Sequence, residues 1–61
     1  MTPEELHMVD QWIAYGWSDD TIGANWQQNV RNHGNTPPRE TLEETGKRLR
    51  REIEAQKGGR Q

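Results

Sequence analysis

The chain has 61 residues, a net charge of −2 and no cysteine. A chain this short forms one domain at most, and the lack of cysteine excludes disulfides, thiolate zinc sites and cysteine nucleophiles. The lack of cysteine also fits a reducing compartment, and the N-terminus carries no apolar run. We therefore expect a cytoplasmic protein without a signal peptide or membrane contact.

The first helix is predicted over residues 3–15. Thr2 stands at the N-cap position, Pro3 at the first helical position and Glu5 three residues after the cap, which is the pattern of a capping box. Gly16 can adopt the left-handed conformation that ends a helix. These signals predict a first helix of three to four turns.

This first helix is expected to be apolar on two faces. The face predicted to enter the core holds Leu6, Val9 and Ile13. The nearly opposite face holds Met8, Trp12 and Tyr15. Since a small bundle has little room to cover both, the second face is a candidate surface for a partner protein or a second copy. For Trp12, burial and exposure both stay open.

The second helix is predicted over residues 19–32. Ser18 is expected to cap it, and Asp19 and Asp20 lie in its first turn, where the helix dipole favours acids. Its buried face repeats every four residues: Ile22, Trp26 and Val30. Gly34 and the two prolines that follow separate this helix from the rest of the chain.

The third helix is predicted over residues 38–56, with Thr36 or Thr41 as its cap. Three pairs with a spacing of four residues are expected on its surface: Glu43 with Lys47, Glu44 with Arg48, and Arg50 with Glu54. The sequence thus predicts an all-α three-helix bundle over residues 1–57 and a flexible tail over 58–61. An alternative is a third helix that projects and forms a homodimer.

The core of this bundle is predicted from the apolar stripes of the three helices and from the tryptophans that continue them. With no phenylalanine in the chain, the tryptophans must supply much of the buried area. The predicted core residues are Leu6, Val9, Ile13, Trp17, Ile22, Trp26, Val30, Leu42, Leu49 and Ile53.

Catalytic and metal-binding patterns are not found in the sequence. Ser18, the only serine, is explained as a helix cap. Glu4 and His7 supply only half of the ligands that a metal site in a helical bundle needs. We expect a protein that is not an enzyme, with no metal, no cofactor and no small-molecule substrate.

The acidic and basic residues are unevenly distributed. Residues 1–38 hold five acids and one base, Arg31, whereas residues 39–61 hold seven bases and five acids. The run Lys47-Arg48-Leu49-Arg50-Arg51 could neutralise phosphates of a nucleic acid. Several of these bases have an acid one turn away, so an ordinary solvated helix face is an equal alternative.

Three segments of the first two predicted helices share a pattern with a known family. They are Thr2-Pro3-Glu4-Glu5, Trp12-Ile13-Ala14-Tyr15-Gly16 and Ser18-Asp19-Asp20-Thr21-Ile22-Gly23. Together they resemble the opening of Myb/SANT-like small helix-turn-helix regulators of bacteria and phages. Asn35-Thr36-Pro37-Pro38, followed by the basic run, is similar to the recognition helix of that family.

This resemblance implies a DNA-binding transcription regulator, encoded by a phage or a bacterium. Bases in and just before the third helix would contact phosphates, while Thr41 or Glu44 would approach base edges. The bases expected to contact phosphates are Arg39, Lys47, Arg48, Arg50 and Arg51.

A second function class stays open beside DNA binding. Tyr15-Gly16-Trp17 is similar to the Met-Gly-Phe loop of ubiquitin-associated three-helix domains, which implies a protein-binding module. In this alternative the chain is a phage-encoded inhibitor or adaptor that binds a host protein. Its anchors would be Met8, Trp12 and Tyr15.

Overall fold

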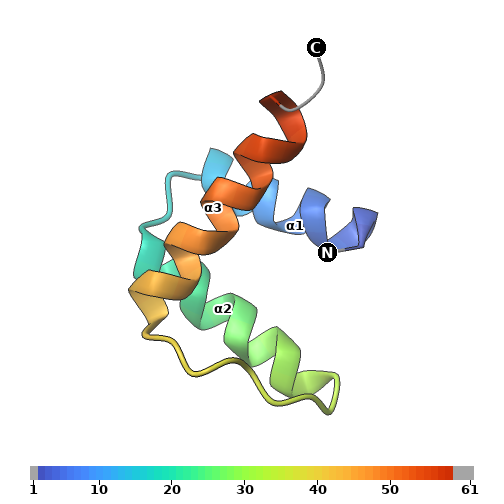
Figure 1. Cartoon of the computed structure of the whole chain (residues 1–61), viewed down its shortest axis with the longest axis vertical. Coiled ribbons are helices and arrows are strands. Elements are labelled where there is room, and N and C mark those ends of the chain that lie inside the picture. The colour runs from blue at the N-terminus through green and yellow to red at the C-terminus, as the bar shows by residue number, and fades with distance from the viewer. Residues whose placement is uncertain (1, 59–61) are drawn as a thin grey trace.

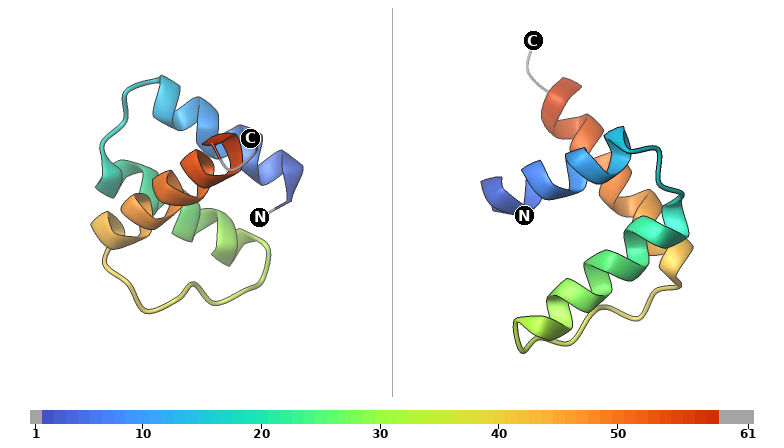
Figure 2. Two further views of the ribbon diagram at one scale, coloured as in Figure 1. Left: turned by 45° about the horizontal axis from the view of Figure 1, so that its top comes forward. Right: turned by 180° about the vertical axis from the view of Figure 1, so that it is seen from behind.

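A computed structural model describes residues 2–58 of the chain. Within that range the protein consists of three α-helices without a strand, which confirms the predicted all-α three-helix bundle. They are α1 (Pro3–Ala14), α2 (Asp19–Asn32) and α3 (Leu42–Gly58). α3 packs mainly on α2, and its C-terminal half crosses α1 (Figures 1 and 2).

The ends of the first two helices follow the predicted signals closely, with one exception. Thr2 and Glu5 form a complete capping box, with N···O distances of 2.8 and 3.2 Å. Gly16 ends α1 with a φ of 84°, in the left-handed region. Ser18 is the N-cap residue of α2, but the expected cap bond is absent: the Thr21 N–H donates to Asp20 Oδ1 at 3.1 Å instead, and the Ser18 hydroxyl donates to the same oxygen.

The third helix begins at Leu42, four residues later than predicted. Of the two candidate caps, Thr41 is the one used: its Oγ1 accepts from the Glu44 N–H at 3.1 Å, and its own N–H donates to Glu44 Oε1 at 3.0 Å. The preceding residue, Glu40, is held outside the helix because its carbonyl accepts from Gln27 Nε2 at 3.3 Å. The loop of residues 33–41 therefore runs back along α2 (Figure 1).

The core is smaller than predicted. Its fully buried apolar side chains come from all three helices: Val9, Ile22, Leu49 and Ile53. Five partly buried apolar side chains pack around them: Leu6, Trp12, Ile13, Trp17 and Trp26. Leu42 was predicted to be a core residue but is 42% exposed, because it is the first residue of α3. Val30 is only half-buried.

Two glycines bring α2 and α3 into direct backbone contact, which the sequence stripes did not predict. A Cβ atom on Gly23 would overlap the Leu42 carbonyl, and a Cβ on Gly46 would overlap the Asp19 backbone. Both glycines are buried. The first halves of α2 and α3 therefore pack at a distance that only glycine permits at these two positions.

The remaining predictions about chain organisation have mixed outcomes. Gly58, which was predicted to begin a flexible tail, is the last residue of α3, and residues 59–61 lie outside the described range. Among the described residues, no helix is long and apolar enough to cross a membrane.

Candidate functional site

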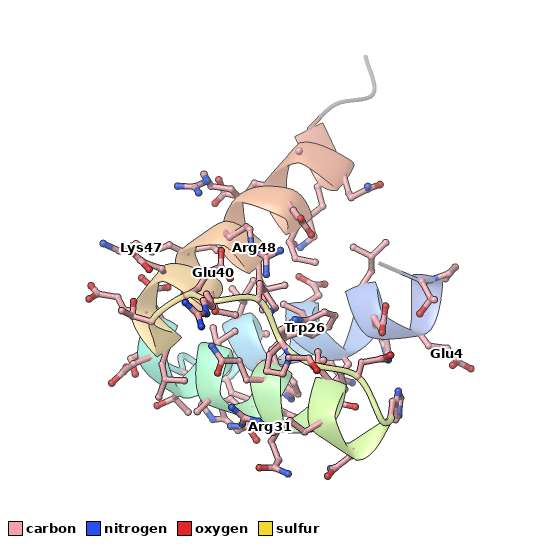
Figure 3. The ribbon with its side chains drawn as sticks, turned by 60° about the horizontal axis from the view of Figure 1, so that its bottom comes forward. Glu4, Trp26, Arg31, Glu40, Lys47 and Arg48 are labelled. Atoms are coloured by element: carbon pink, nitrogen blue, oxygen red, sulfur yellow. The ribbon has the colours of Figure 1, made fainter. Side chains whose placement is uncertain are left out.

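Arg48 occupies the centre of an ion-pair network between α3 and the loop that precedes it. Its guanidinium donates to both carboxylate oxygens of Glu40, with Nε–Oε2 at 3.0 Å, and it also contacts Glu52 at 3.4 Å (Figure 3). The hydrogen bond from Arg48 is the main reason that the pKa of Glu40 lies below its ordinary value. The charge of Arg48 is thus largely satisfied within the chain.

A buried polar pair extends this network into the interface of α2 and α3. The Thr45 hydroxyl is fully buried, accepts from Gln27 Nε2 at 3.0 Å and donates to Glu40 Oε1 at 3.0 Å. Gln27 is 6% exposed. Neither residue belongs to an apolar stripe, so no pattern in the sequence indicated that they are buried. Their role is to fix the loop against the two helices.

The other bases of α3 that were predicted to bind phosphate are also mostly paired. Lys47 contacts Glu43 at 3.3 Å, which confirms that predicted pair. Arg50 instead reaches Asp19 at the start of α2, at 3.0 Å, so its predicted pairing with Glu54 is wrong. The predicted pair of Glu44 with Arg48 is wrong too, because Arg48 binds Glu40 and Glu52.

The residues predicted to approach DNA bases already have structural partners. Thr41 and Glu44 hydrogen-bond each other reciprocally at the start of α3. Of the five bases predicted to contact phosphates, only Arg39 and Arg51 are exposed and make no ion pair within residues 2–58. A phosphate-binding surface would therefore have to compete with ion pairs that the fold already makes.

Three aromatic side chains gather where α1 ends and the chain turns into α2. The Trp12 and Trp17 rings are stacked, with centroids 5.7 Å apart and planes at 20°. The Tyr15 ring lies 5.6 Å from Trp17, tilted by 52°. Trp12 and Trp17 pack against the core, whereas Tyr15 is 64% exposed. We refer to Trp12, Tyr15 and Trp17 as the aromatic cluster.

The predicted anchors Met8, Trp12 and Tyr15 do not form one uniform surface. Trp12, for which burial and exposure were both open, is half-buried and supports Tyr15 through Trp17. Met8 is half-buried as well, and its sulfur accepts a hydrogen bond from Asn29 Nδ2 at 3.2 Å on α2. Trp17 was predicted as a core residue only, yet it joins the two other rings. The turn at Gly16 is what brings it back beside them.

Two shallow hollows lie on the surface of the described residues. One, of about 190 Å³, lies between α1 and α3, and it is lined mainly by apolar surface of Leu6, His7, Asp10, Ile53, Gln56 and Lys57. The other, of about 360 Å³, is polar and lies at the starts of α2 and α3. No group of histidine, aspartate or glutamate side chains within residues 2–58 is arranged to hold a metal ion.

Comparison with known proteins gives no significant match to a protein family, to a curated protein or to a solved structure.

Proposed function

We propose that this chain is a non-enzymatic protein-interaction module that binds its partner through the aromatic cluster. The observation that carries this proposal is the 64% exposure of Tyr15, beside two tryptophans that are held in place by the core. Tyrosine and tryptophan are enriched among the residues that dominate binding energy at interfaces. A rigid aromatic anchor also loses little conformational entropy when it binds.

The two tryptophans of the cluster are well placed to hold Tyr15 as such an anchor. Trp12 belongs to α1. The backbone N–H of Trp17 donates to the backbone carbonyl of Trp12 at 3.4 Å, which fixes the turn between the two residues. The stacked indoles then form a backing for the Tyr15 ring. Because the backing is part of the fold, a partner would meet a surface that is already ordered.

The same structure gives less support to DNA binding as a regulator. Arg48 and Arg50 are bound to acids of other elements, and Thr41 and Glu44 are engaged in a helix cap. Phosphate contacts would then depend chiefly on Arg39 and Arg51. DNA binding stays a prediction, and we place it second to protein binding.

Capture of binding partners from cells that express this chain tests the proposal, with nuclease added so that nucleic acid does not bridge proteins. The matched baits are the wild type, Tyr15→Ala and Gln28→Ala, whose side chain is exposed on α2. We expect a protein that the wild type and Gln28→Ala retain and that Tyr15→Ala loses by about tenfold or more in affinity. Equal retention by all three baits, with each bait folded by circular dichroism, contradicts the proposal.

A further inference from the structure

We infer that the aromatic cluster receives an arginine side chain of its protein partner. This inference rests on the proposed function and adds the chemistry of the partner. The Tyr15 ring supplies a π face at the surface, and the partly buried Trp17 indole lies beside it. Such faces attract a guanidinium through the negative potential of the ring.

The ring spacing decides where the cation can lie. Trp12 and Trp17 are stacked with centroids 5.7 Å apart, which leaves no room for a third group between them. Tyr15 is tilted by 52° to Trp17, so these two rings form an open angle rather than a closed stack. The guanidinium is therefore expected on the solvent side of Tyr15 and Trp17, in contact with one ring face and the edge of the other.

The charges around the cluster favour a cationic partner group. α1 ends beside Tyr15 without a basic residue in its last turn, so the negative end of its dipole is uncompensated by a side chain there. Of the five acids in residues 1–30, Asp10 and Asp19 are paired with bases of α3, whereas Asp20, three residues after Trp17, makes no ion pair within residues 2–58. Asp20, close to Trp17 in the sequence, has its pKa lowered by the hydrogen bond from Ser18, which keeps its carboxylate ionised.

Two bases of α3 reach the first two helices, and both are matched there by acids. Lys57 contacts Asp10 at 2.7 Å, and Arg50 contacts Asp19 at 3.0 Å. Arg50 also donates to the Trp17 carbonyl at 3.4 Å. The nearby cations are thus neutralised, and they leave the exposed faces of the cluster to a cation from outside.

Arginine fits this surface better than lysine does. Its guanidinium is planar and weakly hydrated, so it can stack on a ring and still donate hydrogen bonds from its edge. The lysine ammonium is a compact, strongly hydrated point charge.

The test uses three synthetic peptides: acetyl-Gly-Leu-Arg-Leu-Gly-amide and the same peptide with citrulline or lysine in place of arginine. Citrulline keeps the shape of arginine but has no charge. The chemical shifts of the tryptophan indole N–H groups and of the Tyr15 backbone N–H are followed by NMR at constant ionic strength. We expect saturable shifts with the arginine peptide and about three- to fivefold weaker binding of each of the other two.

Variants localise the response. Tyr15→Ala is expected to weaken binding of the arginine peptide to the level of the citrulline peptide, whereas Tyr15→Phe and the control Gln28→Ala are expected to bind like the wild type. Equal binding of the arginine and citrulline peptides overturns the inference, as does binding that is unaffected by Tyr15→Ala. Lysine binding as tight as arginine overturns the assignment to arginine.

Two further outcomes separate this inference from the proposal on which it rests. If the same resonances shift on dilution without peptide, a second copy covers the cluster and the inference is wrong. If the peptides do not discriminate but Tyr15→Ala still loses its captured protein, the arginine assignment fails and the protein-interaction function stands. If Tyr15→Ala retains every captured protein, the function itself fails.

Discussion

The contact between α2 and α3 differs in kind from the contact of either helix with α1. α2 and α3 meet backbone to backbone at Gly23 and Gly46, and the Gln27–Thr45 hydrogen bond is buried beside that contact. α1 is joined to them by side chains alone, through Val9 and the partly buried residues around it. The bundle therefore has one closely fitted pair of helices and one helix that packs on it over fewer contacts.

This difference suggests a division of roles within a very small protein. The close pair uses its charged residues internally, since Arg48 and Arg50 tie α3 to the α2–α3 loop and to α2. α1 instead ends in an aromatic cluster whose outermost ring is exposed. A fitted pair can support a surface that is shaped for binding rather than for packing.

The largest effect is expected from Gly23→Ala. The new methyl group would meet the Leu42 carbonyl, a backbone atom that cannot move aside without separating α2 from α3. We expect a loss of about 3 kcal/mol or more in the free energy of unfolding, at the upper end for overpacking. That is a large share of the roughly 3–9 kcal/mol expected for a domain of this size.

Urea denaturation followed by circular dichroism measures this effect. Gly58→Ala is the matched control, because a Cβ atom at the last residue of α3 would meet nothing within 4 Å. It is expected to leave stability unchanged or slightly raised. If Gly23→Ala is as stable as this control, α2 and α3 do not pack as closely at this position as described above.

A smaller effect is expected from Thr45→Val. Valine keeps the approximate shape of threonine but removes the acceptor for Gln27 and the donor to Glu40, inside a fully buried site. Leaving a buried polar group unpaired costs about 1–3 kcal/mol, and we expect a loss of that size. Thr45→Ser keeps the hydroxyl and is expected to lose less. A serine variant that is the less stable of the two would show that the methyl group, not the hydrogen bonds, matters here.

The smallest stability effect is expected from Glu40→Gln, and it should depend on pH. The folded-state pKa of Glu40 lies below its ordinary value of 4.5 because Arg48 donates to it. The stabilisation it gives is therefore present above that ordinary value and is lost as the pH falls through the lowered folded-state pKa. Glu40→Gln should lower the urea midpoint at pH 7 and reduce the further loss on acidification.

Glu54→Gln provides the control for this pH dependence, since it removes the same charge from an exposed position of α3. Its urea midpoint at pH 7 should fall less than that of Glu40→Gln. Identical pH profiles for the wild type and Glu40→Gln would contradict a stabilising role for the Glu40–Arg48 pair.

The helices were largely predictable from local signals, and the fit between them was not. Thr2, Pro3 and Gly16 act within one turn of the chain, so their meaning can be read from neighbouring residues. The role of Gly23 and Gly46 could not be predicted locally, because it depends on a partner helix that is distant in sequence. The same is true of Thr45 and Gln27, whose burial is explained only by each other and by Glu40.

The candidate site was predictable in part for the same reason. Helical spacing identified Trp12 and Tyr15, but Trp17 joins them only through the turn at Gly16. The basic run of α3 suggested a phosphate-binding surface because residue spacing identifies only those acids that lie on the same helix as the bases. The acids that pair with Arg48 and Arg50 most closely, Glu40 and Asp19, lie outside α3.

Native-state hydrogen exchange followed by NMR tests the division between the close pair and α1 most directly. We predict that amides of α2 and α3 near Gly23 and Leu49 exchange only through global unfolding, with the highest free energies in the chain. Amides of α1 near Val9 should exchange at a lower free energy, through an opening that leaves α2 and α3 paired. Equal protection of all three helices, or higher protection of α1, would contradict this account.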